Sequence, residues 1–193
     1  MSGFTLPNTR YRERSLPPLA SMDERGRVIY MGTFSKSLSP ALRINYLVLP
    51  EPLLAQWREA FAASYSPVPW LNQKVLARFM TDGSRDRHVR RVQAKNRRKY
   101  TALLAALEET MGDKIEVMEN GTGLHLLVRV PDGRGQDELI AQAAAADVAV
   151  YPTGKYWADP DHHPDSVVLI GFSSIAEADI RPGIEALARA WFG

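Results

Sequence analysis

Short apolar runs alternate with longer amphipathic stretches along this chain, which predicts a protein built from both strands and helices. Apolar runs bounded by Pro, Gly or charged residues are typical of strands, whereas apolar positions three and four apart are typical of helices. On this basis we expect strands at 27–31, 44–50, 148–152 and 166–172. We expect helices at 51–64, 70–80, 85–110 and 137–147, and a last helix that ends near residue 191.

The stretch from Lys114 to Val130 alternates between apolar and polar residues, and Asn120-Gly121 in its middle is a strong hairpin turn signal. The order of elements after residue 110 is then strand, strand, helix, strand, strand, helix. Ser174 and Glu177 have the spacing of a capping box at the start of the last helix. Because proline disrupts a helix interior, Pro182 leaves the first residue of this helix undetermined by several positions.

The two strands of the first part look apolar on both faces. Strands of this kind belong in a parallel sheet that is covered on both sides, and two strands cannot make such a sheet alone. We therefore predict an α/β fold in which an incomplete parallel sheet is followed by a small α+β domain. The predicted parts are a partial large domain (1–65), linking helices (66–110) and the small domain (111–193).

Composition narrows the class of protein only a little. The chain has 193 residues, 45% of them hydrophobic and 24% charged, with a formal net charge of +2 and no cysteine. The lack of cysteine excludes disulfides, zinc-thiolate sites and thiol nucleophiles, and it is compatible with a reducing compartment. No apolar run approaches the roughly 20 residues of a membrane span, and the N-terminus lacks the apolar core of a signal peptide. We expect a soluble, cytoplasmic protein with no membrane partner.

The polar connection between the first two strands, "GTFSKSLSPALR", is the best candidate for chemistry. Lys36 follows a predicted buried strand, and open α/β sheets bind ligands at the carboxyl ends of their strands. A lysine that forms a Schiff base must be neutral, and positive charge nearby favours the neutral form. The other suitable groups are the small Gly32, the hydroxyls of Thr33, Ser35, Ser37 and Ser39, and the guanidinium of Arg43. A phosphate-bearing aldehyde such as pyridoxal phosphate would use all of them, whereas a surface turn with a solvated lysine is the alternative.

The string "RVIYMGTFSKSLSPALRINYLVLP" closely resembles the cofactor-lysine segment of fold-type-I pyridoxal-phosphate enzymes, the class I/II aminotransferase family. It is most similar to the aminotransferase-like domain of MocR-type regulators of the GntR family and to 2-aminoadipate-type aminotransferases. The resemblance implies that Lys36 forms the internal aldimine with pyridoxal 5'-phosphate. It also implies that Arg43 and Thr33 bind the cofactor phosphate, with Ser35 adjacent. By the same resemblance the first part is the end of the family's large domain.

Two features depart from the family's pattern. The family's N-terminal portion has no counterpart here, and it includes a winged helix-turn-helix and the Asp that keeps the cofactor ring nitrogen protonated. In "VVLIGF", Leu169 stands where related aminotransferases carry an arginine that holds the substrate carboxylate. We therefore expect a truncated member of the family, with a sensor-like or degenerate site.

Three functions stay open at this point. The chain is an aminotransferase-like transferase, or the effector-binding and dimerisation part of a MocR-type regulator that lacks its DNA-binding domain. The third possibility is a remnant, or one half of a split protein. The resemblance implies an amine or amino acid as ligand, and a homodimer or a complementing chain as partner.

Three further features are interpreted as structural. The basic stretch "RDRHVRRVQAKNRRK" could contact nucleic acid, but we favour the solvated face of an amphipathic helix and expect no nucleic-acid binding by this chain alone. His162 and His163 lack zinc spacing and predict a loop, so we expect no metal. His125 is expected to be a half-buried, hydrogen-bonded strand residue.

Overall fold

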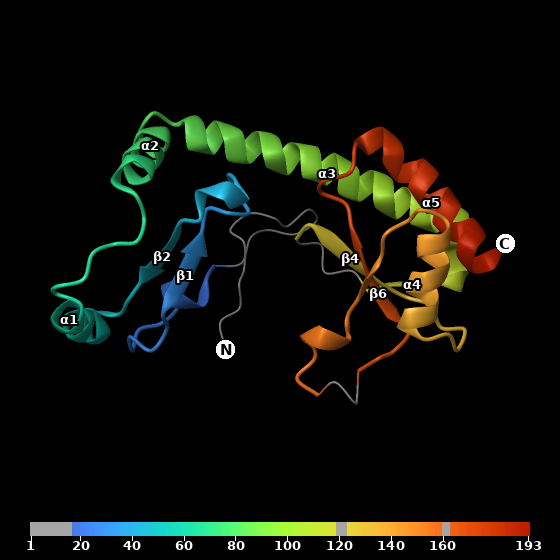
Figure 1. The fold of residues 1–193 in the computed structure, drawn as a ribbon, viewed down its shortest axis with the longest axis horizontal. Coiled ribbons are helices and arrows are strands. Elements are labelled where there is room, and N and C mark those ends of the chain that lie inside the picture. The colour runs from blue at the N-terminus through green and yellow to red at the C-terminus, as the bar shows by residue number, and fades with distance from the viewer. Residues whose placement is uncertain (1–16, 119–122, 160–162) are drawn as a thin grey trace. The chain divides into compact units, whose positions relative to one another are not determined.

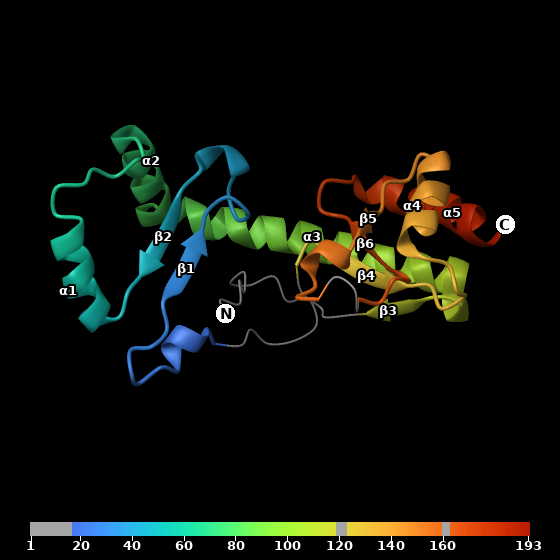
Figure 2. The same ribbon diagram turned by 60° about the horizontal axis from the view of Figure 1, so that its bottom comes forward.

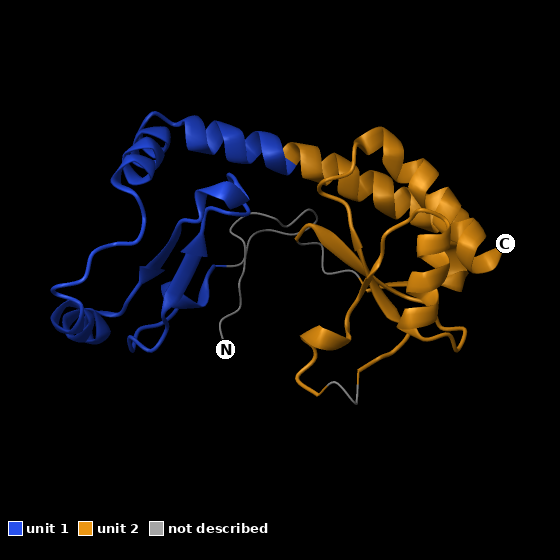
Figure 3. Cartoon of the chain, viewed as in Figure 1, with its two compact units in different colours: residues 1–8, 14–93 blue, residues 9–13, 94–193 orange. Residues whose placement is uncertain are grey.

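Two groups of helices and strands make up the protein, which we describe from a computed structural model of residues 17–118, 123–159 and 163–193 (Figure 1). They form two compact units, and the division falls between residues 93 and 94 (Figure 3). Helix α3 (Ser84–Met111) begins in unit 1 and ends in unit 2. No helix among the described residues is long and apolar enough to cross a membrane.

Unit 1 is built on a pair of strands, β1 (Tyr30–Thr33) and β2 (Asn45–Val48). They are antiparallel, with Gly32 opposite Tyr46. The short helices η1 (Leu19–Ser21) and η2 (Pro40–Leu42) lie before β1 and between the strands. Two α-helices follow, α1 (Glu51–Ala60) and α2 (Trp70–Thr81).

The α/β class is confirmed, but the expected parallel arrangement is wrong for β1 and β2. Parallel neighbours need a crossover of roughly a dozen or more residues, usually a helix, whereas the connection from Phe34 to Ile44 is shorter and holds only η2. All residues of β2 are exposed, and Leu47 and Val48 retain 53% and 55% of their accessible surface, whereas β1 is mostly half-buried. The other described residues therefore leave the apolar side chains of β2 uncovered.

The core of unit 1 is small. Phe34, Ile44 and Leu76 are buried together, and Leu38, Leu42 and Val68 pack around them. Because Phe34 and Ile44 bound the connection between the strands, this core fixes both ends of that connection against α2.

Unit 2 has the predicted order of elements. After η3 (Gly112–Lys114), the structure has β3 (Glu116–Met118), β4 (His125–Arg129), α4 (Gln136–Ala145), β5 (Tyr151–Pro152), η4 (Gly154–Tyr156), β6 (Val167–Gly171) and α5 (Glu177–Phe192). The sheet order is β3-β4-β6-β5, and all neighbours are antiparallel. The predicted Asn120-Gly121 turn lies outside the described residues.

One continuous apolar core holds unit 2 together. It joins α3, the sheet, α4 and α5, and its members include Leu107, Val128, Leu139, Val168 and Leu187, all fully buried. Figures 1 and 2 both show α5 alongside the C-terminal half of α3. The indole nitrogen of Trp191 donates to the backbone oxygen of Leu139 at 3.0 Å, which ties α5 to α4.

Two local predictions in unit 2 are wrong. Helix α5 begins at Glu177 with Ala176 as its N-cap, and no side chain caps it. Glu177 is therefore the first helical residue rather than the third, so it cannot form the reciprocal bonds of a capping box with Ser174. His125 lies in β4 as expected, but its side chain is exposed rather than half-buried because it starts the strand on the outward side.

Candidate functional site

The lysine loop, residues 32–43, is closed at its base by the backbone. The N–H of Phe34 donates to the carbonyl of Ile44 at 3.1 Å, and the N–H of Leu38 donates to the carbonyl of Phe34 at 2.8 Å. The second bond makes residues 34–38 a tight turn, and Lys36 stands in its middle with an exposed side chain. A buried base and a short turn thus present the lysine amine to solvent.

Two hydroxyls hold the loop's own backbone. The Oγ1 of Thr33 accepts the N–H of Ser35 at 3.1 Å, and the Oγ of Ser39 accepts the N–H of Ala41 at 3.3 Å at the start of η2. A hydroxyl that accepts one bond still has its own hydrogen to donate. Thr33 can therefore support the loop and also donate to an anion.

Arg43 is an exposed residue with an unusual backbone. It ends η2 with φ 50° and ψ 34°, the left-handed region that a non-glycine side chain rarely adopts. Such a conformation costs about 1 to 3 kcal/mol and persists only where the surroundings enforce it. Here the neighbouring Ile44 is held in the core and by the bond to Phe34.

The structure brings the four predicted site residues into one loop. Thr33 ends β1, and Ser35 and Lys36 follow this strand. Arg43 precedes β2, so all four residues lie next to or between the hydrogen-bonded Phe34 and Ile44. A primary amine, hydroxyl donors and a guanidinium suit an aldehyde that carries a phosphate. The role of each residue stays a prediction.

Sequence reasoning missed Tyr46, whose ring fills the space beside Gly32. A Cβ on Gly32 would lie 2.1 Å from Cζ of Tyr46. The Tyr46 ring centroid is 5.5 Å from that of Phe34 and 6.1 Å from that of Tyr30. Burial raises the pKa of the Tyr46 hydroxyl, and its hydrogen bond with Tyr30 acts in the same direction. The pattern that could have indicated Tyr46 is a glycine, Gly32, paired with an aromatic residue on the neighbouring strand.

Leu169 lies in β6, opposite Leu127 of β4 and Tyr151 of β5. Its side chain is half-buried. From the resemblance, related aminotransferases are expected to carry a carboxylate-binding arginine at this position. Here the position holds the apolar Leu169, with Leu127 beside it.

The basic stretch forms part of α3, as predicted. The basic stretch was expected to be a solvated helix face, but Lys99 is only 2% exposed. Its Nζ donates to the carbonyl of Ser173 at 2.7 Å. Burial lowers the pKa of Lys99, and the positive charge of Lys95 lowers it further. Arg98 pairs with Glu177 of α5 at 3.2 Å. At least these two basic residues serve the packing of unit 2.

The histidine pair is described only in part. His162 lies outside the described residues, and the Nε2 of His163 is 2.8 Å from Nε2 of Gln136 and 3.6 Å from Oδ1 of Asp165. Across the described ranges, no group of three or more Asp, Glu or His side chains could hold a metal ion.

The fold and the lysine loop together define an aminotransferase-like α/β protein. A family model described as aminotransferase class I and II matches residues 3–157. The chain belongs to this family, as the lysine segment predicted.

Among curated proteins, the chain is 37% identical over 183 residues to the uncharacterized HTH-type transcriptional regulator YdeL of Bacillus subtilis. It is 28% identical over 183 residues to the probable rhizopine catabolism regulatory protein MocR of Rhizobium meliloti. Each match covers 94% of this chain but only 39% and 36% of the respective relative. The predicted similarity to MocR-type regulators is therefore confirmed, and the chain spans less than half the length of these relatives.

A solved structure with the same fold is LysN, the α-aminoadipate aminotransferase of Thermus thermophilus. It is 26% identical, with a TM-score of 0.79, and the match covers 95% of this chain and 47% of LysN. LysN was solved as a complex with N-(5'-phosphopyridoxyl)-L-leucine.

Proposed function

We propose that this chain supplies the lysine and phosphate-binding side of a pyridoxal 5'-phosphate site in an aminotransferase-like domain. The observation that carries the proposal is the exposed Lys36 in a turn whose base is buried and hydrogen-bonded. The likeness to LysN, which binds a phosphopyridoxyl compound, supports the choice of cofactor.

Each residue of the loop has a distinct task in this proposal. The Nζ of Lys36 would hold the cofactor at its aldehyde carbon and would take up or return a proton. The guanidinium of Arg43 and the hydroxyls of Thr33 and Ser35 hold the phosphate, because charge-assisted hydrogen bonds to an anion are the strong ones. The bound cofactor supplies an electron sink for amine chemistry.

The second candidate is a binding domain without turnover, as in the effector part of a MocR-type regulator. Leu169 favours it, because an apolar side chain at this position cannot anchor an amino-acid carboxylate. The regulator relatives support it as well. The ligand would be an amine or an amino acid, and a second copy or a complementing chain would complete the site.

Absorbance spectroscopy tests the cofactor site. Pyridoxal phosphate added to the chain should give a visible band that is lost in Lys36→Ala and retained in Lys74→Ala, a control lysine on α2. Reduction with borohydride and peptide mapping should then place the label on Lys36. A label spread over several lysines, or a band that survives Lys36→Ala, contradicts the proposal.

One further measurement tests the phosphate-binding role of Arg43, and another separates the two candidate functions. Arg43→Gln should weaken cofactor binding by roughly tenfold or more, since it removes a charge-assisted bond to the phosphate. A panel of amino acids that fails to convert the bound cofactor to its amine form would favour the binding domain over the enzyme. Conversion by any amino acid would favour the enzyme.

A further inference from the structure

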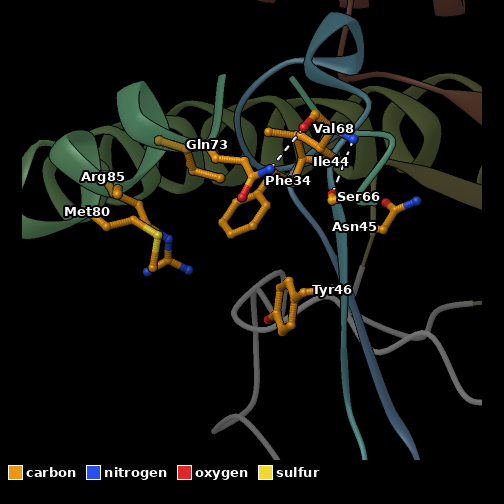
Figure 4. A pocket seen from close by; sticks show the side chains of 11 residues that line it. Phe34, Ile44, Asn45, Tyr46, Ser66, Val68, Gln73, Met80 and Arg85 are labelled. Atoms are coloured by element: carbon orange, nitrogen blue, oxygen red, sulfur yellow. Dashed lines mark hydrogen bonds between the residues drawn. The ribbon is translucent and has the colours of Figure 1, made fainter. Parts of the chain in front are cut away.

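A pocket in unit 1 combines apolar walls with one cationic side chain. Its volume is about 560 Å³, within the range of roughly 300 to 1,000 Å³ of small-molecule sites. Phe34, Ile44, Val68, Leu76 and Met80 form the apolar part of the lining (Figure 4). The pocket borders the lysine loop through Phe34 and Ile44, but its lining does not include the predicted cofactor groups Thr33, Ser35, Lys36 and Arg43.

Arg85 is the charged residue of this lining. Its Nη1 lies 3.1 Å from Oδ1 of Asp86, while its Nε is buried and has no hydrogen-bond partner. It is the one such side-chain atom found in the part of the chain that the structure describes. A ligand cannot reach that buried nitrogen, but the Arg85 side chain as a whole retains 33% of its accessible surface and belongs to the pocket lining.

The other polar side chains of the lining are neutral, and two of them hold the wall itself. The Nε2 of Gln73 donates to the carbonyl of Val68 at 2.9 Å, and the Oγ of Ser66 accepts the N–H of Val68 at 3.3 Å (Figure 4). Tyr46 contributes its hydroxyl, close enough to Arg85 for the guanidinium to act on its pKa. Among the lining residues, Arg85 is therefore the one whose side chain carries a charge.

We propose that this pocket binds a small carboxylate with an aryl or alkyl body. The accessible part of the Arg85 guanidinium donates to the carboxylate, and the body packs against Phe34, Leu76 and Met80. A single guanidinium already shared with Asp86 matches one negative charge better than the two of a phosphate. The apolar walls favour a ligand whose remaining surface is hydrocarbon.

The test is calorimetric titration of the full chain with 3-phenylpropionate and with 3-phenylpropionamide, which has the same body and no charge. The acid should bind roughly tenfold or more tightly than the amide, because a hydrogen bond to a charged group is the stronger one. Arg85→Gln should remove this preference. Arg78→Gln, which removes an exposed arginine of α2 outside the lining, should leave it intact.

Two more variants make the result decisive. Ala77→Phe places a ring in the pocket and should abolish binding of both compounds, with circular dichroism to confirm that the fold persists. Lys36→Ala should leave binding unchanged, so failure here is distinguishable from failure of the cofactor site. Equal affinity for acid and amide, or an acid preference that survives Arg85→Gln, overturns the proposal.

Discussion

At the scale of the residue, Gly32 and Tyr46 show how strongly one position constrains the lysine loop. Gly32 belongs to β1, directly before Thr33, and faces the ring of Tyr46 across the strand pair. That ring in turn lies beside Phe34, which anchors the loop in the core of unit 1. The small size of Gly32 is therefore needed for packing rather than for backbone freedom.

Gly32→Ala should destabilise unit 1 by about 1 to 3 kcal/mol, because the added methyl group overpacks the site and displaces the Tyr46 ring. Urea unfolding measures the change. Gly171→Ala is the matched control, since Gly171 ends β6 and no atom lies within 4 Å of an added Cβ. Equal stability of the two variants would mean that the Tyr46 ring moves aside without cost.

At the scale of the element, α3 and α5 are joined by both apolar and ionic contacts. Leu107 and Leu187 lie in the core between them, whereas Arg181 pairs with Glu109 at the surface. Both partners of the ion pair are about half exposed, so water screens their attraction. Burial of apolar surface should therefore dominate the stability of this helix pair.

Leu187→Ala should lower the free energy of unfolding by about 2 to 5 kcal/mol, because the side chain is fully buried and its removal leaves a cavity. Arg181→Gln should cost less than about 1 kcal/mol. Thermal or urea denaturation of the two variants compares these effects directly. A larger loss in Arg181→Gln would contradict a packing-dominated interface.

At the scale of the whole molecule, the two units differ in how much apolar surface they bury. The core of unit 2 connects helices and sheet, whereas that of unit 1 is limited to Phe34, Ile44 and Leu76 with a few neighbours. Several large side chains of unit 1 stay exposed, including Trp57, Phe61 and Trp70. Local stability follows buried apolar contacts, so it should be unequal along the chain.

Hydrogen exchange should therefore be faster in β1, β2, α1 and α2 than in β4, β6 and α5, by roughly an order of magnitude or more. Mass spectrometry of peptic peptides measures this difference. Bound pyridoxal phosphate should slow exchange around the lysine loop and leave β4 and β6 unchanged. Equal protection in the two units would contradict the difference in their cores.

Much of the secondary structure could be predicted from the sequence, because periodicity and turn residues act locally. The helices 70–80 and 85–110 agree with α2 and α3 to within a residue. The expected strand at 148–152 is reduced to Tyr151–Pro152, after a turn in which Asp147 has a positive φ of 59°. This turn is a helix C-cap, in which the N–H of Asp147 donates to the carbonyl of Ala144 and the N–H of Val148 to that of Ala143. Val148 is thereby bonded to the helix end instead of to a neighbouring strand.

The sequence by itself determined the family, the order of the elements and the chemistry-bearing string around Lys36, because these depend on residues adjacent in the chain. Tertiary structure decided the antiparallel pairing of β1 and β2, the burial of Lys99 against Ser173, and the pocket beside Arg85. Each of the three depends on contacts between residues far apart in sequence. The short connection between β1 and β2 already argues against a parallel pair, but the burial of Lys99 and the pocket beside Arg85 follow only once the folded backbone brings distant residues together.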